Sequence, residues 1–218
     1  IKMKKEVLKN SYDMFSESSF KKHIFEGNVI IIKKSDEISD IIKKTEEYLT
    51  SFFNIRNNIT KDNFLKFKNE NDKFFQILQN RIKNCKIIRK KFAEFLKKIG
   101  LKPSETYMDL ITLRYSPSLN EKPIGKLLPA PPHRDTWASN IFNQINLWFP
   151  ISDIQKDNSI YILSEYFNKA IHNNSSKWSF KNHKNKKGYP SVPKAIVKLK
   201  KKEKKGFKLS KGEVLCFS

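Results

Sequence analysis

The sequence has few residues of the kinds that mark secreted or membrane proteins. Its 218 residues include two cysteines, Cys85 and Cys216, and their spacing is not that of a metal site. Both lie in apolar patterns, which favours buried thiols in a reducing compartment over a disulfide. No apolar run reaches the length of a membrane-spanning helix, and no signal peptide is recognisable after Ile1. We therefore expect a cytoplasmic location and no membrane partner.

Arginine is scarce, although the chain is strongly basic. Only five of the 44 basic residues are arginines, and the formal net charge is +22 at pH 7. Proteins that read DNA bases favour arginine for its planar fork of donors, so this composition argues against sequence-specific DNA binding. The densest positive segment, residues 194–208, has eight lysines and one glutamate. We interpret the charge as a solvated basic surface, and binding to nucleic acid or another polyanion stays open as an alternative.

The remaining composition predicts one folded domain over residues 1–218. A hydrophobic fraction of 38% and 17 phenylalanines are typical of a globular chain with a sizeable core. The first part, residues 1–103, is mainly helical by its apolar periodicity. Its predicted elements are a strand over residues 27–32, a helix over 35–52 that begins at Ser35, and one continuous helix over 75–99 that ends at Gly100.

The second part, residues 104–218, changes to the alternating pattern of strands. Strands are predicted over residues 107–115, 141–151, 159–163, 195–199 and 213–217, with loops over 116–132 and 172–190. A helical part followed by antiparallel strands predicts an α+β fold. We expect a jelly-roll or cupin-like barrel, with the N-terminal helices packed against it as a buttress.

A histidine and an aspartate two residues apart, His133 and Asp135, are the candidate metal ligands and catalytic residues. On an extended segment their side chains point to the same side of the chain. Pro131 and Pro132 precede them and restrict the backbone. An imidazole and a carboxylate are two of the three ligands of the facial triad that holds non-haem Fe(II) and leaves coordination positions open.

The strand that follows this pair has two amides and a tryptophan on one face. Gln144, Asn146 and Trp148 alternate with the aliphatic and aromatic residues of the other face. Such a strand suits the wall of a barrel whose polar inner face lines a site, and an ordinary half-exposed strand is the alternative. Gln144 and Asn146 are candidates for contacts with a 2-oxo acid or for orienting a metal ligand, and Trp148 is a candidate pocket wall.

Together these residues resemble the phytanoyl-CoA dioxygenase-like branch of the Fe(II)/2-oxoglutarate-dependent dioxygenases. The runs that carry the resemblance are His133 to Trp137, Gln144 to Ile151, Asn158 to Leu163 and Lys211 to Ser218. The resemblance covers residues 107–218, about half of the chain. It implies a double-stranded β-helix, Fe(II) and 2-oxoglutarate as cofactors, and hydroxylation of a small or medium organic substrate with O2.

The resemblance also assigns roles to single residues. Tyr115 is similar to the family's cosubstrate contact, with core packing as its alternative role. Arg114 alternates to the opposite face from Tyr115 and is left out of the site. Members of the family that halogenate lack the carboxylate, so Asp135 favours hydroxylation.

The third metal ligand is the point at which the sequence departs from the family. The distal histidine of the family follows the strand that residues 213–217 resemble, and an arginine for 2-oxoglutarate comes after it. We therefore expect the chain to be a fragment, truncated inside the barrel, with its third ligand beyond Ser218 and its isolated activity in doubt. His172 and His183 are alternative third ligands, and a catalytically inactive cupin-like module is the alternative function.

Overall fold

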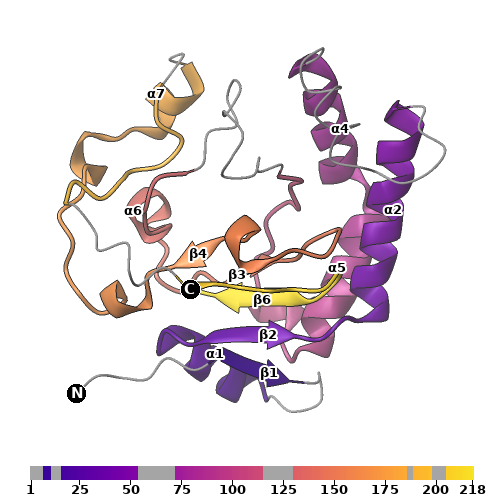
Figure 1. Cartoon of the computed structure of the whole chain (residues 1–218), viewed down its shortest axis with the longest axis horizontal. Coiled ribbons are helices and arrows are strands. Elements are labelled where there is room, and N and C mark those ends of the chain that lie inside the picture. The colour runs from indigo at the N-terminus through magenta and orange to yellow at the C-terminus, as the bar shows by residue number, and fades with distance from the viewer. Residues whose placement is uncertain (1–6, 11–15, 54–71, 115–129, 186–188, 198–204) are drawn as a thin grey trace.

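The computed structural model describes residues 7–10, 16–53, 72–114, 130–185, 189–197 and 205–218 (Figure 1). Its helices are α1 (Glu17–Phe25), α2 (Asp36–Phe53), α4 (Asp72–Asn84), α5 (Lys86–Lys98), α6 (Thr136–Ser139) and α7 (Phe180–Asn185). Its strands are β1 (Val7–Asn10), β2 (Val29–Ile32), β3 (Asn146–Trp148), β4 (Tyr161–Ile162), β5 (Lys205–Gly206) and β6 (Val214–Phe217). The described ranges also contain four 3-10 turns, η2 (Pro103–Glu105), η3 (Lys156–Asn158), η4 (Ser164–Tyr166) and η5 (Ser175–Lys177). The described chain is thus a mixed helix and strand structure.

The predicted helix after Ser35 is confirmed as α2. The Ser35 hydroxyl accepts a hydrogen bond from the backbone N–H of Ile38 at 3.2 Å, which satisfies one of the donors that a helix start leaves unpaired. The side chains of Ile38, Ile41 and Leu49 are at most 1% exposed. The apolar stripe of α2 therefore faces the core, as its spacing predicts.

The predicted single helix over residues 75–99 is wrong, because the structure has two helices there. Cys85 separates α4 from α5 with an extended backbone, φ −71° and ψ 110°. The apolar stripe continues across the break, since Ile82 and Ile88 on either side are buried at 1% and 0% exposure. Apolar periodicity indicates which side of a helix faces the core. A single extended residue between two helices leaves that periodicity unchanged, so the sequence pattern does not reveal the break. Gly100, at φ 90°, follows the end of α5 as predicted.

A four-stranded sheet joins the two ends of the chain, with the order β1-β2-β6-β3. β1 and β2 are parallel, and β6 is antiparallel to both β2 and β3. In Figure 1, β6 lies between β2 and β3, with α2 and α5 together at one end of the sheet. Alternate residues of β2 separate two apolar clusters: Ile30 and Ile32 pack with the helices, while Val29 and Ile31 pack with Phe207.

The second half contains shorter strands than the alternating pattern predicts. The predicted strand over 141–151 is reduced to β3, and the one over 159–163 to β4. Residues 106–114 form no strand, and the side-chain amide of Gln79 hydrogen-bonds both backbone groups of Leu113 in place of a ladder partner. Residues 198–199 lie outside the described residues, and Ala195 forms an isolated bridge with Asn173.

Two further predictions for the second half have mixed outcomes. The predicted polar loop over 172–190 contains η5 and the short helix α7, which is a correction. β6 confirms the predicted C-terminal strand to within one residue.

The described residues form two open sheets, in which β4 pairs only with β5. The double-stranded β-helix therefore stays a prediction. Within those residues no helix is long and apolar enough to cross a membrane.

Candidate metal centre

His133 and Asp135 meet at the point where an irregular segment becomes a helix. The predicted extended conformation is wrong for Asp135, which adopts helical angles, φ −63° and ψ −33°, immediately before α6. The side chains come together nonetheless, with 3.2 Å between Nε2 of His133 and Oδ1 of Asp135. They are 23% and 35% exposed respectively, so solvent and small solutes reach both.

A backbone carbonyl orients the imidazole. Nδ1 of His133 lies 2.6 Å from the carbonyl oxygen of Pro131, so Nδ1 carries the proton that it donates. Histidines that bind metals usually make this bond with one ring nitrogen, because it fixes the ring and leaves the other nitrogen for the ion. In His133 the nitrogen left for an ion is Nε2, the atom that faces Asp135.

The amides of the next strand hold the other oxygen of the carboxylate. Nδ2 of Asn146 donates to Oδ2 of Asp135 at 2.7 Å, and Nε2 of Gln144 lies 3.4 Å from the same oxygen. Gln144 also donates to Oδ1 of Asn146 at 3.0 Å. The prediction that Gln144 and Asn146 share a face is therefore confirmed, and both point at Asp135.

The two ionisable groups shift each other's pKa in opposite directions. Burial of the His133 imidazole disfavours its charge, but the hydrogen bonds with Asp135 and Pro131 outweigh burial and raise the pKa of His133. The hydrogen bond from His133 outweighs the burial of Asp135 and, with the donation from Asn146, lowers the pKa of Asp135. Without a metal the pair is therefore an imidazolium and a carboxylate over a widened pH range.

The spacing of the two side chains fits a divalent cation. Two ligands in adjacent octahedral positions, each about 2.1 Å from the metal, lie about 3.0 Å apart. The 3.2 Å between Nε2 and Oδ1 is close to that separation. Oδ1 of Asp135 would face the ion, while Oδ2 would still accept its hydrogen bond from Asn146. Replacing the shared proton by a metal therefore requires little change in the distance between Nε2 and Oδ1.

A third protein ligand is not found in the described part of the chain. No group of three or more His, Cys, Asp or Glu side chains within it is placed to hold a metal ion. His172 is exposed, and its backbone carbonyl accepts a hydrogen bond from Ile196. The ring of His183, in α7, stacks on Trp178 with 6.5 Å between centroids. Neither histidine therefore completes a triad with His133 and Asp135 in this conformation.

The remaining predicted site residues have different placements. Tyr115 lies outside the described residues. Trp148 packs beside Leu215 and Phe207 in the smaller apolar cluster, and shares the sheet face of Asn146. Arg114, which the alternation argument leaves out of the site, has a small electrostatic effect on it: its positive charge opposes the rise in the pKa of His133 and adds to the lowering of the pKa of Asp135. Residues 106–114 form no strand, so strand alternation does not place this side chain.

Comparisons of the chain with family models, with curated proteins and with solved structures found no match. The functional reading therefore depends on the residue pattern and on the geometry of the pair. Both lead to the same two side chains.

Proposed function

We propose that the protein is a non-haem Fe(II)/2-oxoglutarate-dependent oxygenase that hydroxylates a small or medium organic substrate. The observation that carries this proposal is the 3.2 Å separation of His133 Nε2 and Asp135 Oδ1. Two hydrogen bonds support it: Nδ1 of His133 donates to the carbonyl oxygen of Pro131, and Oδ2 of Asp135 accepts from the amide of Asn146. Hydrogen bonds of this kind orient metal ligands in proteins.

Each residue near the pair has a distinct task in this proposal. His133 and Asp135 hold the iron, which, with 2-oxoglutarate and O2, supplies the oxidising chemistry. Pro131 keeps the proton of His133 on Nδ1 through its carbonyl oxygen. Asn146 fixes the rotation of the Asp135 carboxylate, and Gln144 in turn fixes Asn146. The presence of Asp135 favours hydroxylation over halogenation, as the family resemblance implies.

The proposal still requires a third ligand, which the described residues do not supply. Phe217 of β6 pairs with Asn146 of β3, and the Asn146 side chain donates to Asp135. The C-terminal strand therefore lies beside the candidate metal centre.

The proposed compartment is cytoplasmic and reducing. Both cysteines, Cys85 and Cys216, are buried free thiols, as the sequence predicts. Free thiols and Fe(II) are compatible with the same reducing conditions.

The test is anaerobic addition of Fe(II) and 2-oxoglutarate, followed by visible absorption and, after O2 is admitted, by the loss of 2-oxoglutarate. It is run on this chain and on any longer product of the same gene. We expect a visible band and 2-oxoglutarate consumption that both disappear in His133→Ala and persist in His172→Ala, a matched control. If His133→Ala of the longest product still consumes 2-oxoglutarate, the ligand assignment is wrong. A different result would point to the lysine-rich surface as the functional feature. In that case the chain binds polyanions with an affinity that falls steeply as the salt concentration rises, and Fe(II) has no effect on any form.

A further inference from the structure

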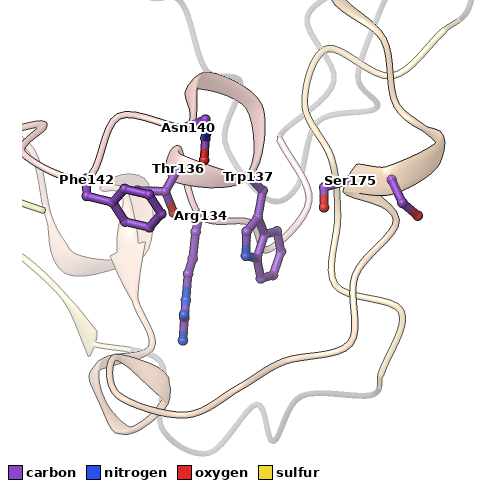
Figure 2. A pocket seen from close by; sticks show the side chains of 7 residues that line it. Arg134, Thr136, Trp137, Asn140, Phe142 and Ser175 are labelled. Atoms are coloured by element: carbon purple, nitrogen blue, oxygen red, sulfur yellow. The ribbon is translucent and has the colours of Figure 1, made fainter.

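A pocket lies beside α6, next in sequence to the candidate metal centre. It has a volume of about 420 Å³, within the usual range for sites that hold small organic ligands. Its walls come from two segments distant in sequence, namely Arg134, Thr136, Trp137, Asn140, Phe142, Ser175 and Ser176. Figure 2 shows the α6 residues on one side of the gap and Ser175 across it.

Arg134 supplies a fixed positive charge to this pocket. Its Nη2 donates to the backbone carbonyl oxygens of Tyr166 and Lys169, the latter at 2.6 Å. Its guanidinium also lies over the ring of Trp137, 5.9 Å from the centroid. Among the described residues, Nη1 and Nε have no hydrogen-bond partner and no carboxylate forms an ion pair with the group. Neutral carbonyls therefore hold the guanidinium in place without cancelling its charge.

The other lining groups are hydroxyls, one amide and aromatic rings, and no acidic side chain is among them. Thr136, Ser175 and Ser176 offer hydroxyls that donate as well as accept. Phe142 is 74% exposed, which is unusual for a large apolar ring. An apolar ligand that covers this ring would remove apolar surface from water, which favours binding.

We propose that this pocket binds a small organic acid with a planar apolar body, the carboxylate on Arg134 and the body against Trp137 and Phe142. Guanidinium and carboxylate are matched in shape as well as charge, which makes their hydrogen bonds stronger than neutral ones. Arg134 and Thr136 flank Asp135 in the chain, so an acid bound here is the candidate substrate of the oxygenase. That role rests on the proposed function, whereas the binding itself needs no metal.

The binding test uses 19F NMR with the metal removed by EDTA. Three fluorinated probes separate the contributions: 4-fluorobenzoate has a ring and a charge, 4-fluorobenzyl alcohol has only the ring, and fluoroacetate has only the charge. We expect 4-fluorobenzoate to bind at least tenfold more tightly than either of the others, a difference of about 1.4 kcal/mol. Equal affinities for 4-fluorobenzoate and the alcohol overturn the proposal, and so do equal affinities for 4-fluorobenzoate and fluoroacetate.

Variants test which side chains are responsible. Arg134→Gln is expected to remove the preference for the acid over the alcohol. Because Arg134 also anchors residues 166–169, Phe142→Ser provides a second test that leaves the fold intact, with an expected loss of about threefold or more for both ring probes. Phe180→Ser is the matched control, since Phe180 is 59% exposed and lies outside the pocket. If Phe142→Ser binds like the unmodified chain, or Phe180→Ser weakens binding as much, the assignment to this pocket is wrong.

The outcomes separate this inference from the proposed function. Acid binding at the pocket without any response to Fe(II) supports the pocket and contradicts the oxygenase. Fe(II) binding at His133 without acid binding contradicts the pocket and leaves the proposed metal centre standing.

Discussion

The helical half and the half that carries the candidate site are built differently. Residues 20–101 supply 17 of the 19 buried residues of the larger apolar cluster, and β6 supplies the other two. Between residues 130 and 197, by contrast, only Pro150 and Pro193 are buried among the residues described there. The first half is therefore held mainly by fully buried apolar side chains. The second half combines partly buried apolar side chains between residues 145 and 162 with hydrogen bonds of single side chains to irregular backbone.

This difference places the stability and the proposed chemistry in separate parts of the molecule. The pair His133–Asp135 depends on contacts of a few ångströms with Pro131, Asn146 and Gln144, whereas the core depends on total buried area. Substitutions in the core should lower the free energy of unfolding most, and substitutions at the site should lower it less while changing metal binding.

The largest expected effect is in the helical half. Phe95→Ala removes a side chain that is 0% exposed in α5, and we expect a loss of about 3–5 kcal/mol in the free energy of unfolding. Phe142→Ala is the matched control, because the same truncation at 74% exposure should cost about 0.5 kcal/mol or less. Urea denaturation followed by circular dichroism measures both. Equal costs for the two variants would refute the separation of the two halves.

A smaller effect is expected at one tight point in the second half. A Cβ added at Gly206 would lie 2.3 Å from the carbonyl oxygen of Lys156, which is backbone and has little room to move. We expect Gly206→Ala to lower the free energy of unfolding by about 1–3 kcal/mol. Lys208→Ala, at an exposed position nearby, should have almost no effect. An unchanged denaturation midpoint in Gly206→Ala would show that β5 does not approach η3 as closely as described.

The two amides beside Asp135 should differ in importance. Asn146→Leu removes a 2.7 Å bond to a charged oxygen, with an expected loss of about 1.5 kcal/mol in the free energy of unfolding. Gln144→Leu removes a 3.4 Å contact to the same atom and a 3.0 Å hydrogen bond to the neutral side chain of Asn146, and its expected cost is about 0.5 kcal/mol. Thermal denaturation in EDTA compares the two variants. A larger cost for Gln144→Leu would mean that the order of these contacts is wrong.

The smallest effect is a pH dependence of stability in the absence of metal. The raised pKa of His133 adds stability that is complete below about pH 6.5 and is lost as the pH rises through the folded-state pKa. The lowered pKa of Asp135 adds stability that is present above about pH 3.9 and is lost as the pH falls through its folded-state pKa. The stability difference between the unmodified chain and His133→Gln should therefore be largest near pH 5–6 and smaller at pH 9. A difference that grows toward pH 9 would contradict the shift.

Sequence periodicity predicted the core well, because burial of Ile38 or Phe95 depends mainly on spacing along one helix. It missed the break at Cys85, which leaves that spacing intact. It also predicted a strand over residues 107–115, where the described residues 107–114 form none. It also missed β1 and α1. Strand pairing joins β2 to β6 across more than 180 residues of sequence, and no local pattern encodes such a register.

The candidate site was predictable only in part, for a similar reason. The pairing of His133 with Asp135 follows from their separation by one residue. The contact between Asp135 and Asn146 follows from the alternation of the strand only if the strand lies beside the pair, and nothing local requires that. Two further features depend on how distant segments approach each other, so the sequence alone did not reveal them. They are the effect of the Arg114 charge on the pair and the hydrogen bonds of the Arg134 guanidinium to Tyr166 and Lys169.

The most direct test of the metal centre is a Co(II) titration of the chain with 15N-labelled histidines, followed by NMR. The four histidines give separate ring signals, and His133→Gln assigns the one that matters. We predict that the His133 signals broaden first, that Asp135→Ala prevents this, and that Co(II) binding weakens as the pH falls and the imidazole retains its proton. If His172 or His183 responds first while the His133 signals stay unchanged, the proposed metal centre is wrong.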